Sequence, residues 1–196
     1  ATPEVHDRIF EIVHRYEKAL QLVGEEVREG NPSPGNKAGG ITTLEEKSLG
    51  CIHKGGHTPV MAVYDYAKQV EPKSGMVIMD TPGNDPSSVA AMVAGGAQVV
   101  VFSTGRGTPT GNPITPVIKI TGNRLTFAKM EDNIDVDASP IIYGGDLKTM
   151  GDELLKLVAE VASGRQTKAE ALGFTEMAYI PTDNLFNGKI TIGGQA

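Results

Sequence analysis

The feature that most constrains the fold is an alternation of short apolar runs with Gly- and Pro-rich loops in the middle of the chain. Residues 76–79 and 97–102 are apolar runs of strand length, and a small-residue helix is predicted between them over 86–95, with Asp85 as its N-cap. Strand, helix and strand in this order are typical of a right-handed parallel crossover. The pattern predicts an α/β fold: a single Rossmann-like domain with a mainly parallel sheet flanked by helices.

Further elements are expected on both sides of this alternation. Apolar residues spaced three to four apart predict an amphipathic helix over 3–28, and an S/T-x-x-E pattern predicts a second helix from Leu44 to Lys54 that stops at Gly55. We also expect strands at 60–63, 117–120 and 125–127, helices at 152–162 and 168–172, and irregular chain at 31–40, 131–146 and 176–196. With 196 residues and no interior linker, the chain is predicted to be one domain.

Composition narrows the classes of partner. The net charge is −6 and no block of basic residues occurs, which disfavours nucleic acid and anionic membranes as partners. The longest apolar run, 99–102, is far too short to span a bilayer. The single cysteine, Cys51, allows no intramolecular disulfide and fits a reducing, cytoplasmic location, where we expect it to be a small buried residue.

Three polar loops are predicted to share one crevice. The segments 80–85 and 104–108 leave predicted strands, and in open α/β sheets ligands bind beyond the carboxyl ends of the strands. A third loop, 31–40, leads into the helix that starts near Leu44. Arg106 lies between two glycines and can bind a carboxylate through two hydrogen bonds. A desolvated lysine or glutamate in such a crevice can remove a proton next to a carboxylate.

Simpler interpretations stay open for each of these residues. Gly-rich turns after strands often only reverse the chain, and Glu45 can serve to close a capping box. Glu46 and Lys47 can be solvated helix surface. His53 and His57 are spaced as a helical metal pair, but Gly55-Gly56 between them should end the helix, so surface or loop histidines are favoured.

Four segments resemble the altronate/galactarate dehydratase family and its relative, the large subunit of sulfolactate sulfo-lyase. They are Pro34–Gly50, Thr81–Asp85, Phe102–Pro109 and Pro116–Lys119, with weaker similarity at 132–136 and 161–164. The segments occur in the family's order and cover most of residues 30–165. The first and third are long and unusual, which makes the resemblance specific.

The resemblance implies a lyase. Members of the family dehydrate sugar acids such as altronate or galactarate to 2-keto-3-deoxy acids, with a divalent metal, typically iron, that polarises the leaving hydroxyl. It also implies that this chain is a C-terminal domain of a longer protein, whose N-terminal domains carry most of the metal ligands. The chain alone is therefore expected to be inactive.

The family's shared polar positions can be carried onto this sequence residue by residue. The expected catalytic group is Lys37, Glu46, Glu45 and Lys47, with Lys37 or Glu46 favoured as the general base. The expected substrate-binding group is Asn36, Asn84, Asp85, Thr104, Arg106 and Lys54. Within it, Arg106 and Asn84 would hold a carboxylate or hydroxyls.

Two alternatives to a sugar-acid dehydratase remain at this point. The first is a sulfo-lyase of the same family, in which the β leaving group is sulfite instead of water. The second is a non-catalytic module that uses its Gly-rich loops to hold an anion or a partner subunit. In the leading interpretation the partner is a small sugar acid, and homo-oligomer formation is left open.

Overall fold

The computed structural model describes residues 1–22, 24, 31–71 and 75–179. These residues form two compact units. Unit 1 takes its described residues from Ala1–Tyr66 and Glu71–Asp80, and unit 2 from Ala67–Val70 and Thr81–Ile180. Each unit combines helices with a small parallel sheet, so the chain is a mixed α/β protein as predicted.

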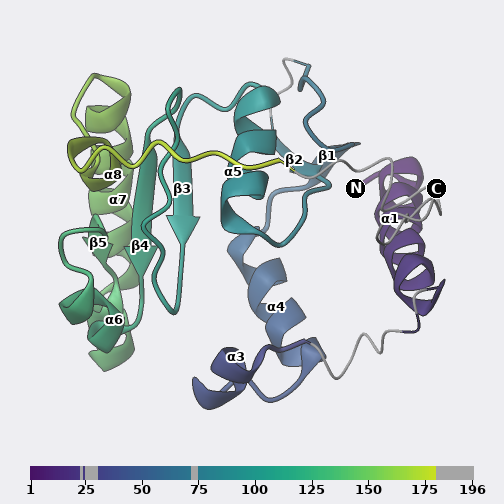
Figure 1. Ribbon diagram of the computed structural model, residues 1–196, viewed down its shortest axis with the longest axis horizontal. Helices are drawn as coiled ribbons and strands as arrows, with labels where there is room; N and C mark the ends of the chain where they lie inside the picture. Colours follow the sequence, from purple (N-terminus) through teal and green to yellow (C-terminus); the bar gives the residue numbers. More distant parts are fainter. Residues whose placement is uncertain (23, 25–30, 72–74, 180–196) are drawn as a thin grey trace, which may run out of the picture. The chain divides into compact units, whose positions relative to one another are not determined.

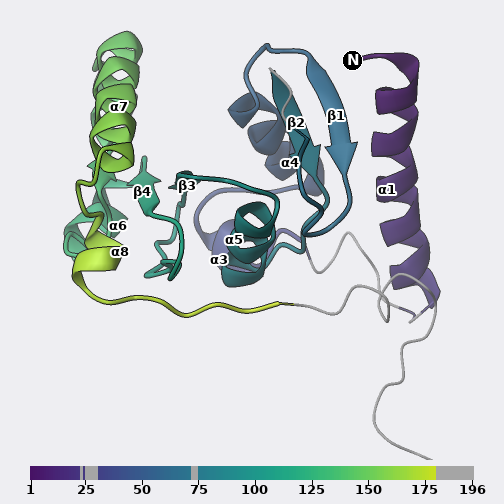
Figure 2. The same cartoon turned by 90° about the horizontal axis from the view of Figure 1, so that it is seen from above.

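Unit 1 is built on one pair of parallel strands (Figures 1 and 2). Its elements are α1 (Pro3–Leu22), α3 (Pro34–Ala38), α4 (Leu44–Lys54), β1 (Val60–Tyr64) and β2 (Met76–Met79). The predicted helix at 44–54 and the predicted strands at 60–63 and 76–79 are confirmed. The predicted continuation of the first helix to residue 28 lies outside the described residues, apart from Gly24.

Two ion pairs and an apolar face attach α1 to β1 and to the strand ends. Val5, Ile9 and Ile12 recur at helical spacing and are half-buried, and α1 contacts β1. Arg8 pairs with Asp65 just after β1, and Arg15 pairs with Asp80 just after β2. The helix is therefore anchored at two turns by charges that flank an apolar stripe.

The loop predicted over 31–40 is partly wrong, because Pro34–Ala38 forms the short helix α3. Pro34 occupies its first turn, where a proline costs no helical hydrogen bond, and Ser33 is the N-cap. The glycines that follow limit its length. Proline and glycine content alone therefore overestimated the extent of irregular chain here.

Unit 2 has three layers. Its elements are α5 (Asp85–Ala94), β3 (Val100–Ser103), β4 (Val117–Thr121), α6 (Arg124–Lys129), β5 (Val136–Asp137), the 3-10 helix η1 (Ser139–Tyr143), α7 (Leu147–Ala162) and α8 (Lys168–Ala171). The strands form one parallel sheet in the order β3-β4-β5. Figures 1 and 2 show α5 beside β3 and α7 on the opposite side of the sheet.

The core of unit 2 lies between α5 and the sheet. Val89 of α5, Val100 of β3 and Val117 of β4 are buried together. Met92, Val93, Ala97 and Phe102 pack around them. Fully burying one such valine contributes about 1.5 kcal/mol or more, so this cluster fixes α5 over β3 and β4. The same packing places the N-terminus of α5 near the chain that leaves β3.

The predicted crossover from 76–79 to 97–102 is wrong. β2 pairs with β1, whereas β3 pairs with β4, so the two predicted strands belong to different sheets. Apolar runs identify strands, but the partner of a strand is decided by contacts distant in sequence. A parallel strand–helix–strand unit does occur, formed by β4, α6 and β5.

Three further expectations in unit 2 need correction. Residues 125–127 lie in α6 instead of a strand, because Asn123 caps the backbone N–H groups of Leu125 and Thr126. Residues 131–146 include β5 and η1 and are not wholly irregular. The helix expected at 152–162 begins at Leu147, where Asp146 is the N-cap.

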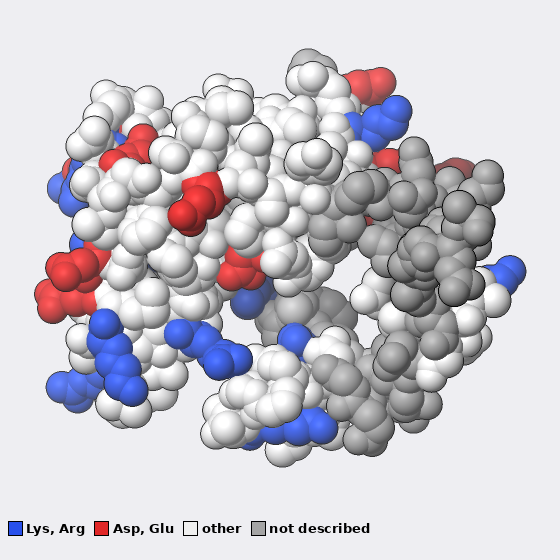
Figure 3. All heavy atoms as spheres, viewed as in Figure 1, with Lys and Arg blue, Asp and Glu red and all other residues white. Residues whose placement is uncertain are grey.

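The surface carries its charges in small groups. Figure 3 shows that much of the visible face is uncharged, with acidic and basic side chains forming no continuous field. No helix within the described ranges is long and apolar enough to cross a membrane. Cys51 is exposed on α4, so the expectation of a buried cysteine is wrong: the sparse apolar face of this helix leaves it uncovered.

Candidate functional site

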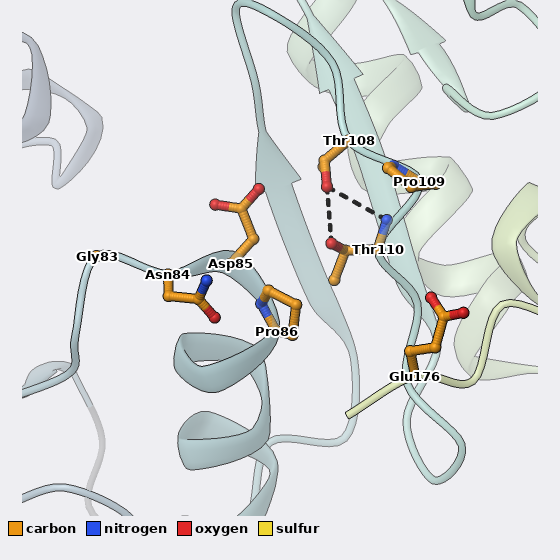
Figure 4. Close-up of a pocket in the computed structure, with 8 residues that line it drawn as sticks. All are labelled: Gly83, Asn84, Asp85, Pro86, Thr108, Pro109, Thr110 and Glu176. Atoms are coloured by element: carbon orange, nitrogen blue, oxygen red, sulfur yellow. Dashed lines mark hydrogen bonds between the residues drawn. The ribbon is translucent and has the colours of Figure 1, made fainter. Parts of the chain in front are cut away.

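A cavity of about 400 Å³ lies in unit 2, where α5 begins. Figure 4 shows that three segments line it: the start of α5, the loop after β3, and the chain after α8. The lining residues are Gly83, Asn84, Asp85, Pro86, Thr108, Pro109, Thr110 and Glu176. Its volume falls in the usual range of about 300–1,000 Å³ for small-molecule sites.

Asn84 and Asp85 form the helix side of this cavity. Asn84 is the N-cap, and its Oδ1 accepts hydrogen bonds from the backbone N–H of Ser87 at 3.3 Å and from the Ser87 hydroxyl at 2.9 Å. The predicted cap, Asp85, is instead the first helical residue. Both residue types are good caps, so the sequence alone did not separate them. Capping uses the oxygen of Asn84 and leaves its Nδ2 to serve as a donor.

Thr108 and Thr110 form the opposite wall. Both are buried, and their hydroxyls lie 2.7 Å apart in a hydrogen bond. The backbone N–H of Thr110 also donates to Oγ1 of Thr108 at 3.3 Å. In Figure 4 this pair lies between Asp85 and Glu176. The two hydroxyls are therefore held in a defined geometry at the cavity wall.

The chemistry of the lining suits hydroxyl groups better than it suits an anion. Two carboxylates, Asp85 and Glu176, face the cavity, and the eight lining residues include no lysine or arginine. A carboxylate accepts hydrogen bonds from hydroxyls, and threonine hydroxyls can donate or accept. A polyhydroxylated ligand would therefore find complementary groups here.

Thr104 and Arg106 lie on the same loop but outside the cavity lining. Oγ1 of Thr104 accepts a hydrogen bond from the N–H of Gly107 at 3.0 Å, which closes the turn. Gly107 has φ +88° and no room for a Cβ beside Met130, so this turn requires glycine. Arg106 is exposed, and no described residue accepts a hydrogen bond from its side chain.

The predicted residues from 36 to 54 all lie in unit 1. Among them, Lys47 and Asn36 are brought together, because Nζ of Lys47 donates to Oδ1 of Asn31 at 2.6 Å and to Oδ1 of Asn36 at 3.3 Å. These bonds tie the Pro/Gly loop to α4. Lys37, Glu45 and Lys54 are exposed. A crevice that joins these residues to Asn84 and Arg106 of unit 2 stays a prediction.

Glu46 caps its own helix. Its Oε2 accepts hydrogen bonds from the backbone N–H of Thr42 at 2.8 Å and from the Thr42 hydroxyl at 2.9 Å, while Oγ1 of Thr43 accepts from the N–H of Glu46. These bonds favour the ionised form, so the pKa of Glu46 is lowered, chiefly by the Thr42 N–H and then by its hydroxyl. A lower pKa makes this carboxylate a weaker base.

This geometry predicts a pH-dependent contribution of Glu46 to stability. Because its pKa is lower in the folded chain, the ionised carboxylate stabilises the fold above its ordinary pKa of 4.5, and this stabilisation is lost as pH falls through the folded-state pKa. Thermal melts should show Glu46→Gln less stable than wild type at neutral pH, with the difference vanishing in acid. Glu45→Gln is the matched control for charge. A difference for Glu46→Gln that is constant with pH would contradict the capping role.

The described residues do not form a metal site of their own. No group of three His, Cys, Asp or Glu side chains among them could hold an ion. α4 ends at Lys54, so His53 lies in its last turn and His57 lies beyond the glycines, which separates the two histidines as expected. The donor set described here therefore does not fit the divalent metal that the resemblance implies.

Four residues near the cavity were not singled out from the sequence. Thr108, Thr110 and Glu176 line it, and Lys119 lies fully buried behind it in β4. A lysine inside an apolar strand is itself a signal, because buried lysines are rare without a partner. Glu176 carried no such signal, since its position depends on how the chain after α8 folds back.

Comparison with known proteins identifies the family. Residues 1–184 match the family model described as "D-galactarate/Altronate dehydratase, C-terminal". The chain belongs to this family. The resemblance drawn from the four sequence segments is thereby confirmed.

Individual relatives agree with this membership. The chain is 43% identical to altronate dehydratase of Escherichia coli over 148 residues, which are 76% of this chain and 30% of that protein. It is 37% identical to altronate dehydratase of Bacillus subtilis over 91% of this chain and 35% of that protein. It is 37% identical to the β subunit of (2R)-sulfolactate sulfo-lyase of Chromohalobacter salexigens over 90% and 46%, respectively. The chain thus spans less than half the length of these relatives.

Proposed function

We propose that the chain is part of a hydro-lyase that dehydrates a sugar acid of the altronate or galactarate type to a 2-keto-3-deoxy acid. The observation that carries this proposal is the family match over residues 1–184. The acidic, hydroxyl-bearing cavity of unit 2 supports it independently, because a sugar acid presents several hydroxyls beside its carboxylate. A cytoplasmic location, homo-oligomer formation and a Rossmann-like fold remain parts of the same proposal.

The reaction would proceed by loss of one water. A general base removes the proton next to the carboxylate, and the electrons of that C–H bond form a C=C bond as the β hydroxyl leaves and takes up a proton. The resulting enol then converts to the 2-keto acid. Positive groups near the carboxylate favour the transition state because negative charge develops there.

Individual roles follow from the residues and their positions. Lys37 and Glu46 are the proposed base candidates, with Glu45 and Lys47 beside them. The lowered pKa of Glu46 makes it a weaker base than it would be without the Thr42 hydrogen bonds, so the choice between the two is left to mutation of each. Asn84, Asp85 and Thr104 would hold hydroxyls, and Arg106 the carboxylate, with Asn36 and Lys54 completing the set. An iron cofactor would need ligands beyond the described residues.

A sulfo-lyase is the second candidate, because the (2R)-sulfolactate sulfo-lyase subunit aligns with 90% of this chain. The two reactions share removal of the α proton and differ in the leaving group, which is water in one case and sulfite in the other. The lining of the cavity favours the dehydratase, since it offers carboxylates where a sulfonate would need cations.

One assay tests both candidates. The full gene product that contains this chain is incubated, with ferrous iron supplied, with altronate, galactarate and sulfolactate, while 2-keto acid and sulfite are measured. We expect 2-keto-3-deoxy acid from one of the sugar acids. Sulfite from sulfolactate, without turnover of either sugar acid, would transfer the assignment to the sulfo-lyase. Turnover of none of the three would overturn the proposed function.

A further inference from the structure

Lys119 is a charged side chain buried in the centre of a sheet. It lies in β4, opposite Phe102 of β3, and its side chain is 0% exposed. Val117 and Ile118 of the same strand are buried beside it. Taking an ammonium group out of water is strongly unfavourable unless other groups compensate. A lysine at this position therefore calls for a physical reason.

The hydrogen-bond partner of this lysine belongs to the cavity wall. Nζ of Lys119 donates to the backbone carbonyl of Thr110 at 3.2 Å. The carboxylate of Asp135, whose charge acts on Lys119, binds backbone groups instead: its Oδ2 accepts from the N–H of Lys119 at 2.7 Å, and its Oδ1 from the N–H of Lys168 at 2.8 Å. Among the described residues, Nζ thus has one hydrogen-bond partner, and that partner lines the cavity.

The surroundings of Lys119 disfavour its charged form. Burial lowers the pKa of Lys119, the negative charge of Asp135 opposes this effect, and the positive charge of Lys168 adds to it. The protein keeps the group in place although its charged form is disfavoured. If the role were only structural, an apolar side chain of similar size would fill this position at a lower free-energy cost of burial.

The chain after α8 packs closely against the cavity wall. Gly111 follows Thr110 directly, and a Cβ at this position would collide with the carbonyl oxygen of Phe174. The chain after α8 therefore supports the wall on one side, while Lys119 holds the Thr110 carbonyl. Between these supports, the hydroxyls of Thr108 and Thr110 are fixed at 2.7 Å from each other.

We propose that Lys119 is a positioning residue of the cavity, which holds the Thr110 carbonyl so that the Thr108 and Thr110 hydroxyls meet the hydroxyls of a bound sugar acid. The proposal rests on the proposed function for the identity of the ligand. Lys119 acts through Thr110 and does not itself contact the ligand. Its loss should therefore weaken substrate binding more than it slows the chemical step.

Two variants and a matched control test this role. Lys119→Met keeps the approximate shape and removes the donor, whereas Lys119→Gln keeps an N–H donor. Lys168→Met is the control, because Nζ of Lys168 also donates to backbone carbonyls of the same unit, those of Glu131 at 2.5 Å and Ile134 at 2.8 Å, and neither residue lines the cavity. In the full gene product we expect Lys119→Met to raise KM about tenfold or more with kcat changed about threefold or less. Lys119→Gln should recover part of this loss, and Lys168→Met should leave KM unchanged.

Amide hydrogen exchange gives a readout that does not depend on activity. Exchange should accelerate in Lys119→Met over residues 108–111 and remain unchanged in β3 and β4, with no acceleration over 108–111 in Lys168→Met. Faster exchange spread over the whole sheet, or unchanged exchange at 108–111, would overturn the positioning role. An inactive wild-type enzyme would refute the proposed function but leave this second readout decisive. If Lys119→Met does not fold, Lys119→Gln is compared with wild type in both measurements.

Discussion

Replacing Arg106 with alanine should reduce kcat/KM for the sugar acid about a hundredfold or more while leaving the melting temperature unchanged. Arg106 is exposed, and no described residue bonds its side chain, so its removal breaks no contact of the fold. Two charge-assisted hydrogen bonds to a carboxylate contribute about 1.5–3 kcal/mol each, and about 1.4 kcal/mol corresponds to tenfold in rate. Steady-state kinetics of the full gene product, with thermal melts, measure both quantities.

Arg124→Ala is the matched control for this prediction. Arg124 is also exposed, belongs to the same unit and starts α6 instead of the loop after β3. Its removal changes the net charge equally, so long-range electrostatic effects should be comparable. We expect near-normal kcat/KM for Arg124→Ala. Turnover by Arg106→Ala at the wild-type rate would remove Arg106 from the substrate site.

Replacing Gly111 with alanine should destabilise the chain by about 2–4 kcal/mol. The added Cβ would overlap the carbonyl oxygen of Phe174 and lie 3.0 Å from Cβ of Ala169, so backbone must move to admit it. For a chain of this size, such a loss lowers the melting temperature by about 5–15 °C. The displaced segment carries Glu176, so the cavity should be disturbed as well.

Gly151→Ala separates this clash from the general effect of replacing glycine. Gly151 lies within α7, and a Cβ there would meet no atom within 4 Å. Alanine is favoured over glycine in a helix, so this variant should be stabilised by about 0.5–1 kcal/mol. Equal stability of Gly111→Ala and wild type would show that the chain after α8 does not pack on the loop as described.

The sequence predicted elements well where local signals agree. The helix at Leu44–Lys54 has a threonine cap, a glutamate three residues later and glycines beyond its end, and it was placed correctly. At Asn123, by contrast, the capping side chain was overlooked, and the segment Leu125–Phe127, with apolar residues at both ends, was expected to be a strand. Short apolar runs fit either structure until their caps are considered.

Strand pairing was the larger failure, because it depends on distant contacts. β2 and β3 were joined into one crossover since they are neighbours in sequence, yet they pair within separate sheets. Asn84 and Asp85 were expected near the loop after β3 on the basis of that wrong sheet. The residues nevertheless meet Thr108 and Thr110, because α5 packs on β3 through Val89 and Val100.

The candidate site was predicted only in part for a similar reason. Asn84 and Asp85 are polar residues in a loop, and the sequence therefore predicted them as substrate-binding residues. Thr108, Thr110 and Glu176 matter through the shape of the cavity, which only the packed chain defines. Lys119 ends the segment Pro116–Lys119 that resembles the family, but the apolar strand pattern around it indicated no role, although a lone lysine there is the unusual feature.

A crystal structure of the full gene product with a bound sugar acid would show directly whether the ligand binds in the cavity of unit 2. We expect hydroxyls of the ligand to lie within hydrogen-bond distance of Asp85 and of the Thr108–Thr110 wall, in the cavity at the start of α5. A sugar acid bound in a site to which none of these residues contributes would contradict this expectation.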